Sequence, residues 1–491
     1  MFSLMKIFDK KAEVSKDEIA AFLKTEPEAL EMFEKAYNAY SIAAGSPDNL
    51  FKINSRQVSE MTAGIELNAP EGLEDIKRRI VNELIAKTVI YDYKDKKSQV
   101  IDLRKEIPDE ELVTREEIMK IPEPYRPVFT GSLMKIDIPG SGRQLLSILK
   151  ECMEQKNPLK QKKLYQIFRQ GLDILDLDAI VYEIIDKNVN SMGYWLPHMV
   201  EIIDEEGFFK IPNTRIIKVP LTLLQLTRQD YMSLTRSTLD IVDEYCRKVF
   251  DLKDDKEYFI KTGTYSSKYD FRNAKVAGAK EIRELGEYLL FIHWQALQMA
   301  HYDLTGRNQP VIYGVSTTTE WVVREYIKDT EHNPCIYHGM PLHTEYRVFV
   351  DFDTDTILGI HPYWDKGVMK KHFERVDDAD ARHDYITYSL AEDQLYNRYF
   401  KNKDTVMEHI KALLPKVDMQ GQWSIDIMQN GNDFYFIDMA VAENSAFFRE
   451  AVPLESRKPM KENWIPDLSD KKERNYFFDK SKNTISDLSI R

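Results

Sequence analysis

The sequence predicts an α+β protein whose N-terminal domain is mostly helical, and three observations carry this expectation. In the first 160 or so residues, apolar side chains recur at helical spacing, as at Leu73, Ile76, Ile80 and Leu84. After about residue 200, short runs of β-branched and aromatic residues alternate with longer helical patterns. Asn430-Gly431 separates the last two of these runs, which indicates a hairpin of antiparallel strands. Antiparallel strands with interleaved helices are typical of α+β folds.

The individual elements follow from the same patterns. Ser15 with Glu18 and Thr25 with Glu28 form capping-box pairs that open N-terminal helices. Residues 88–125 are rich in charge and interrupted by prolines, a pattern that predicts loops with a short strand or two. Residues 161–200 again show a helical pattern. Further helices are expected near 239–245, 281–301 and 404–414. Strands are expected at 215–219, 258–261, 321–327, 345–352, 357–361, 423–428 and 433–438.

Composition excludes several classes of function. The chain has 491 residues, 43% hydrophobic and 30% charged, which is typical of a globular protein of two to four domains. The net charge of −13 argues against broad binding to nucleic acid or membrane surfaces. No apolar run reaches the roughly 20 residues of a membrane helix, and the N-terminus lacks signal-peptide features. Cys152, Cys246 and Cys335 form no metal or disulfide pattern. We therefore expect a cytoplasmic protein with no nucleic-acid or membrane partner.

Lys261 ends a predicted strand and is followed by a loop of small hydroxylated residues, Thr262–Ser267. An ammonium on a flexible stem suits an α- or β-phosphate, and loop amides can bind the other phosphate oxygens. The alternative is a structural lysine, which is common at the end of a strand.

The segment 321–327 is a buried-looking strand that turns into a linker. Arg324, Glu325, Tyr326 and Ile327 are its candidate nucleotide-binding residues, because exposed backbone there can read an adenine edge and Glu325 can accept from a ribose hydroxyl. The alternative is an edge strand with a surface Arg–Glu pair, worth about 0–1 kcal/mol.

The last predicted strands contain charged residues in a pattern that suits phosphate and metal binding. Glu345 and Arg347 share one face of a strand, and the guanidinium fork of Arg347 matches phosphate or carboxylate oxygens. Arg347 could also stabilise charge on a transferring phosphoryl group. Asp426 and Asp438 flank the hairpin on neighbouring strands, and two carboxylates with phosphate oxygens are typical magnesium ligands. The alternatives are that the Glu345–Arg347 face, or one of the aspartates, points to solvent.

Together these segments resemble the ATP-grasp fold and, within it, the cell division cycle protein 123 family. Ile260-Lys261, Tyr265-Ser266-Ser267 and Asp270 match its lysine strand and aromatic-Ser-Ser loop. Val323-Arg324 matches its hinge, Glu345–Val350 its Glu-aromatic-Arg strand, and Asp426 with Ile437-Asp438 part of its acidic ending. The family has an asparagine two residues after the last acidic ligand, where this chain has Ala440. One magnesium ligand is therefore lost, or Glu443 or Asn444 replaces it.

The resemblance implies an ATP-grasp-like C-terminal region with ATP and magnesium as cofactors. Residues 1–160 are then the helical accessory domain, 161–255 the first part of the ATP-grasp region, 256–450 the nucleotide-binding domain and 451–491 a tail. The expected function is an ATP-dependent carboxylate–amine ligase that forms an acyl phosphate, with Lys261 and Arg347 as catalytic residues. The expected acceptor is a protein, a peptide or a small-molecule carboxylate. The alternative is an ATP-binding assembly factor that clamps a protein partner without ligase turnover, as the namesake family implies.

Overall fold

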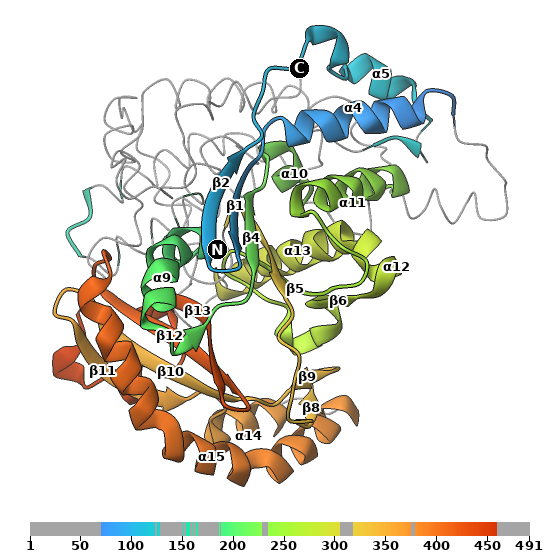
Figure 1. Ribbon diagram of the computed structural model, residues 1–491. Helices are drawn as coiled ribbons and strands as arrows, with labels where there is room; N and C mark the ends of the chain where they lie inside the picture. Colours follow the sequence, from blue (N-terminus) through green and yellow to red (C-terminus); the bar gives the residue numbers. More distant parts are fainter. Residues whose placement is uncertain are drawn as a thin grey trace.

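The computed structural model describes residues 70–122, 125–127, 188–227, 234–304, 318–374 and 379–458, with a few positions between 151 and 186. The expected capping boxes at Ser15 and Thr25, the residue Cys152 and the tail beyond residue 458 lie outside these residues. The described part is a mixed α+β structure built on two mainly antiparallel sheets, with a short two-stranded sheet of β8 (Cys335–Ile336) and β9 (Met340–Pro341) (Figure 1).

The larger sheet has six strands in the order β2-β1-β4-β7-β5-β6, and every pairing in it is antiparallel. Its strands are β1 (Val89–Lys94), β2 (Lys97–Asp102), β4 (Thr214–Lys218), β5 (Glu257–Thr262), β6 (Lys275–Ala277) and β7 (Glu320–Glu325). One face is covered by helices α4 (Leu73–Ile85), α10 (Leu221–Leu226), α11 (Arg236–Phe250), α12 (Gly278–Arg283) and α13 (Leu285–Leu304). We call this unit the six-stranded lobe.

Apolar periodicity explains how these helices pack. Leu73, Ile76, Ile80 and Leu84 lie on one side of α4 and are buried, as the sequence predicts. In α11, the side chain of Thr235 accepts a hydrogen bond from the backbone N–H of Thr238 and so caps the helix. The buried side of α11 packs against both α4 and α13, which gives this lobe one continuous core.

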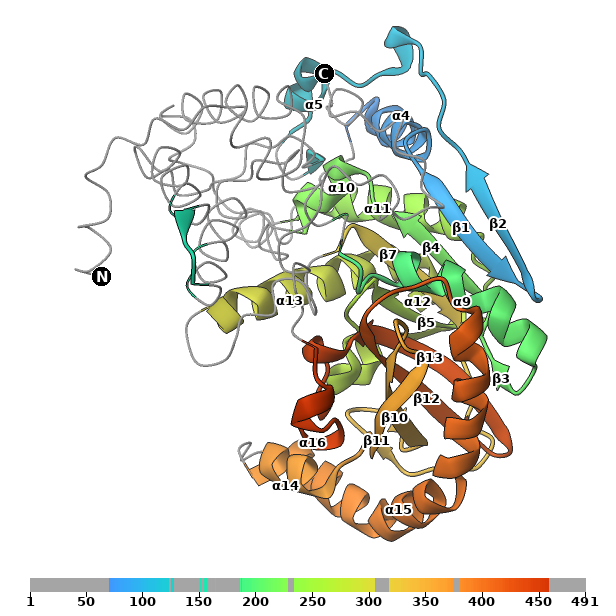
Figure 2. The same cartoon turned by 90° about the vertical axis from the view of Figure 1, so that its left-hand side faces the viewer.

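The smaller sheet has the order β11-β10-β12-β13-β3, antiparallel except for the parallel pair β13–β3. Its strands are β3 (Phe209–Lys210), β10 (Thr344–Asp351), β11 (Thr356–Pro362), β12 (Gln422–Asn430) and β13 (Asp433–Val441). Helices α9 (Met192–Glu206) and α15 (Ala379–Leu413) cover one face (Figure 2). With α14 (Lys366–Glu374) and α16 (Phe448–Ala451), this sheet forms the five-stranded lobe.

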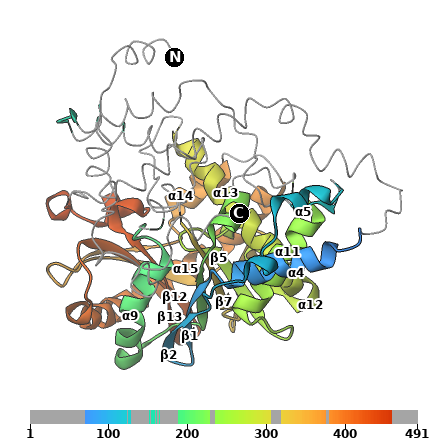
Figure 3. The same ribbon diagram turned by 90° about the horizontal axis from the view of Figure 1, so that it is seen from above.

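The expected boundary at residue 160 does not separate the described N-terminal residues from the rest. Strands β1 and β2 extend the six-stranded sheet beside β4, and α4 packs on α11. These contacts join segments more than 100 residues apart, so local sequence patterns do not reveal them. Seen from above, α4 lies among α5 (Arg115–Lys120), α11 and α12, beside rather than within the five-stranded lobe (Figure 3).

Other expectations differ only in detail. The helix expected at 404–414 is the end of the 35-residue helix α15, and the hairpin turn consists of Gly431 and Asn432, one residue later than expected. Cys246 and Cys335 are free thiols. Within the ranges that the structure describes, no helix has both the length and the apolar character needed to cross a membrane.

Candidate functional site

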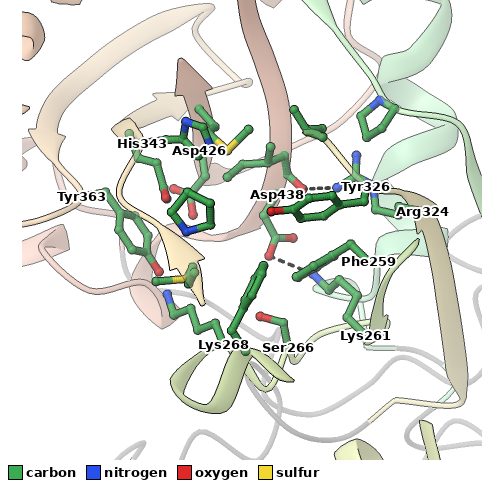
Figure 4. Close-up of a pocket in the computed structure, with 18 of the residues that line it drawn as sticks. Phe259, Lys261, Ser266, Lys268, Arg324, Tyr326, His343, Tyr363, Asp426 and Asp438 are labelled. Carbon is green, nitrogen blue, oxygen red and sulfur yellow. Dashed lines mark hydrogen bonds and ion pairs between the residues drawn. The ribbon is translucent and has the colours of Figure 1, made fainter. Parts of the chain in front are cut away.

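A pocket of about 160 Å³ lies where the polar face of the five-stranded sheet meets strands β5 and β7 (Figure 4). One buried water needs only roughly 10–15 Å³, so this space is far larger than a hydration site. The pocket wall includes seven of the eight residues singled out from the sequence: Lys261, Arg324, Glu325, Tyr326, Ile327, Asp426 and Asp438. The eighth, Arg347, is hydrogen-bonded to Asp426.

Strand alternation explains why Lys261 faces this pocket. In β5 the apolar residue Ile260 enters the helix-covered core, so its neighbour Lys261 points to the opposite side of the sheet. The ammonium of Lys261 donates a hydrogen bond to Asp438 Oδ2 at 2.9 Å, across the junction of the two lobes. The lysine side chain is only 3% exposed, whereas that of Asp438 is 39% exposed. The expected phosphate-binding lysine and the expected metal-binding aspartate are therefore paired with each other.

Arg347, Asp426 and Asp438 form a row across three neighbouring strands. Arg347 is the direct cross-strand partner of Asp426, which in turn is the partner of Asp438. Arg347 donates from Nε and Nη2 to the two oxygens of Asp426, at 2.8 and 2.6 Å. Both aspartates line the pocket, where Asp426 is buried and Asp438 is partly exposed to solvent.

Arg324 is buried and bonded within the protein. Its guanidinium donates to Thr214 Oγ1 at 3.1 Å and to the carbonyl oxygen of Ile437 at 2.7 Å. Burial lowers its pKa to about 10. The alternative of a surface pair on an edge strand is wrong, because β7 lies between β4 and β5 and Arg324 is only 4% exposed. Arg324 therefore joins the two lobes, and its donors are directed at protein oxygens.

The linker after β7 forms one end of the pocket. Glu325 accepts hydrogen bonds from the amide of Asn213 at 2.9 Å and from the ammonium of Lys256 at 3.1 Å. The N–H of Tyr326 donates to the carbonyl oxygen of Glu257. The N–H of Ile327 makes no hydrogen bond to any residue that the structure describes, so it is available to a ligand. Apolar side chains surround this end, notably Phe259, Met340 and Met428.

Two carboxylates face the pocket as possible metal ligands. Asp426 and Asp438 offer the hard oxygen donors that magnesium prefers. Ala440 lies on the same face as Asp438, two residues further along β13, and has no donor side chain. Among the residues that the structure describes, no group of three or more His, Cys, Asp or Glu side chains is placed to hold a metal ion. A metal here would therefore depend on oxygens of the ligand or water for most of its coordination.

Sequence reasoning missed Lys268, which lines the pocket together with Tyr363 and His343 (Figure 4). Lys268 begins a short 3₁₀ helix, Lys268–Asn273, where no periodic pattern marks the inward side. Its position directly after Tyr265-Ser266-Ser267, itself a loop singled out from the sequence, is the signal that could have identified it.

Glu345 predicts a pH dependence of stability. Burial raises the pKa of its carboxyl to about 7, and the neighbouring Asp426 adds to this effect. An unfolded glutamate titrates near roughly 4.3. The native state therefore binds more protons than the unfolded state between these values, so this contribution to stability is lost as the pH rises towards 7.

Glu345→Gln removes the titrating group. Between pH 5 and pH 7, we expect the free energy of unfolding of the wild type to fall relative to that of the variant by on the order of 1–3 kcal/mol. Urea titrations at each pH measure this difference. Parallel pH profiles for the two proteins would show that the Glu345 carboxyl titrates normally.

Comparison with known proteins gives weak similarities only. No family model matches the chain, and no curated protein matches it. Among solved structures, a C-terminally truncated Cdc123 from Schizosaccharomyces pombe aligns with a TM-score of 0.31 and 14% identity, over 56% of this chain and 94% of that one. Cdc123 from the same organism aligns with a TM-score of 0.31 and 13% identity over the same shares. A TM-score this low indicates neither the fold nor the function of this chain. The function is therefore inferred from the geometry of the pocket.

Proposed function

We propose that this chain binds ATP with magnesium in the pocket between its two lobes, and that the lobes form an ATP-grasp-like cleft. One observation carries the proposal. Lys261 from one sheet and the row Arg347–Asp426–Asp438 from the other converge on a pocket with an apolar far end. There the backbone N–H of Ile327 makes no hydrogen bond to a described residue. A nucleotide has the matching parts, since its base is flat and its phosphates are charged.

The two ion pairs of the pocket suit such a ligand. Lys261 and Asp438 neutralise each other, as do Arg347 and Asp426. When a magnesium–triphosphate complex enters, the cations can turn to phosphate oxygens while Asp426 and Asp438 hold the metal. Each charge then keeps an opposite partner, which avoids leaving a buried ion unpaired. Bound magnesium would offset negative charge on the phosphate oxygens.

The reaction we propose for the bound ATP is carboxylate–amine ligation. A carboxylate oxygen of the acceptor attacks the γ-phosphorus and ADP leaves. An amine then attacks the acyl carbon, phosphate leaves, and the amine nitrogen loses a proton to water. The protein's part is to orient the reactants and to offset charge with Lys261 and Arg347. A protein, peptide or small carboxylate is the proposed acceptor.

A second candidate is an ATP-binding assembly factor that clamps a protein partner without ligation. Ala440 favours it, because the side chain that would complete a set of three ligands is missing from β13. The two candidates differ in turnover. A ligase releases ADP in amounts that depend on the acceptor when fractionated lysate is added, whereas a clamp binds ATP with little ADP release.

A thermal-shift titration tests the shared step. At 100 times its dissociation constant, a ligand adds about 2.7 kcal/mol to stability. We expect ATP to raise the unfolding temperature in the presence of magnesium, with a smaller shift for ATP alone and for magnesium–GTP. No shift at millimolar magnesium–ATP would overturn the proposal.

A further inference from the structure

Lys268 differs from the other cations at the pocket: its electrostatic partner is Glu345, but no hydrogen bond or close ion pair joins its ammonium to a described residue. Lys261, Arg324 and Arg347 all donate to carboxylate, hydroxyl or carbonyl oxygens. Lys268 lines the same pocket, yet its ammonium makes no hydrogen bond and no ion pair with any residue in the described part of the chain. It is therefore the cation that a ligand can engage without first breaking an existing bond.

The surroundings of Lys268 are aromatic. Its Nζ lies 4.2 Å from the ring centroid of Tyr363 and 5.9 Å from that of Trp364. Burial lowers the pKa of the ammonium, while the nearby carboxylate of Glu345 opposes this change. Aromatic faces stabilise a cation only partly, so a desolvated ammonium gains most from an anion that approaches it directly.

Glu345 does not exclude such an anion. Its carboxyl lines the pocket beside Lys268, and burial raises its pKa to about 7. Burial and Asp426 favour the uncharged form of this carboxyl, whereas Lys268 opposes that effect, and the uncharged form repels a second anion less than a carboxylate does.

The position of Lys268 indicates which part of a ligand it would meet. Figure 4 shows Lys268 and Tyr363 on one side of the pocket, and Tyr326 and Arg324 on the other. Asp438, with Lys261 bonded to it, lies between them. A nucleotide whose base lies at the Tyr326–Ile327 linker would therefore pass Lys261 first and extend its outermost phosphate towards Lys268.

From this geometry we infer that Lys268 binds the terminal phosphoryl oxygens of the nucleoside triphosphate and makes the pocket prefer ATP to ADP. The inference rests on the proposed function. It adds a specificity-determining residue, because the γ-phosphate is the part of the nucleotide farthest from the base and is absent from ADP.

Binding constants for magnesium–ATP, magnesium–ADP and AMP, measured calorimetrically on the full chain, test this role. Lys268→Met keeps the apolar stem against Tyr363 and removes the charge. We expect it to weaken magnesium–ATP binding by at least tenfold while changing magnesium–ADP and AMP binding less than threefold. Lys268→Arg keeps the charge and should retain more of the preference for ATP.

Lys403→Met is the matched control. Lys403 also lies over an aromatic ring, that of Phe400 at 5.8 Å, but neither residue belongs to the pocket wall. Lys403→Met should leave all three constants unchanged. Equal losses for the three nucleotides in Lys268→Met, or no loss, would overturn the inference. A wild-type protein that binds no nucleotide would instead overturn the proposed function.

Discussion

Lys261→Met is expected to abolish the stabilisation of this protein by magnesium–ATP. The ammonium of Lys261 is buried and lines the pocket, and methionine keeps the packing of its stem while removing the charge. At a ligand concentration of 100 times the wild-type dissociation constant, the variant should lose most of the roughly 2.7 kcal/mol of ligand stabilisation. Thermal unfolding with and without magnesium–ATP measures this loss.

The fold itself should tolerate this change. Asp438, the ion-pair partner of Lys261, is 39% exposed, so water can solvate its carboxylate once the lysine charge is gone. We expect the unliganded variant to unfold within about 1.5 kcal/mol of wild type. Lys253→Met, which removes an exposed lysine paired with Asp251, is the control and should keep the full response to the nucleotide. A normal response in Lys261→Met would remove Lys261 from the binding site.

Strand patterns predict which residues of β10, β12 and β13 share a face, but not the exact register of the polar row. Glu345 and Arg347 alternate with apolar Tyr346 and Val348, and that alternation places both charges on the face opposite α15, as observed. The hairpin makes β12 and β13 neighbours, as expected, because a strand's side-chain period and a tight turn are both local properties. Asp426 and Asp438 come into direct register only through a β-bulge between Asp426 and Ile427, which the turn position does not predict.

Features that depend on distant segments could not be predicted. Arg324 looks like a surface or hinge residue until β13 supplies the carbonyl of Ile437, more than 100 residues away. Strands β1 and β2 show no sign in the sequence of belonging beside β4. Lys268 faces the pocket because of a short irregular helix, for which no hydrophobic period exists. In each case tertiary contacts, not local propensity, determine the position.

The pair Arg347–Asp426 should have a large effect on stability. Both side chains are about nine-tenths buried, at 11% and 10% exposure, and two short hydrogen bonds join them. Arg347→Met leaves the carboxylate of Asp426 buried without its partner and close to Glu345. Removing one partner of a buried pair typically costs about 3–5 kcal/mol, and we expect a loss of that size in urea unfolding at pH 8.

The loss in Arg347→Met should shrink as the pH falls. Without the guanidinium, burial favours the protonated form of Asp426, so the native state takes up a proton that the unfolded state binds only at lower pH. Stability relative to wild type should therefore recover towards pH 5. Arg78→Met, which breaks an exposed pair with Asp75, is the control and should cost less than about 1 kcal/mol at both pH values.

A double variant separates the cost of an unpaired charge from the value of the pair itself. Replacing both partners, as Arg347→Met with Asp426→Leu, removes both buried charges together and should recover most of the stability lost in Arg347→Met. It should nevertheless remain unable to respond to magnesium–ATP, because both a phosphate ligand and a metal ligand are gone. If stability returned together with a normal nucleotide response, this row of residues would serve the fold and not the ligand. If stability recovers but magnesium–ATP no longer stabilises the double variant, the two buried charges serve nucleotide binding, because the fold is stable without them.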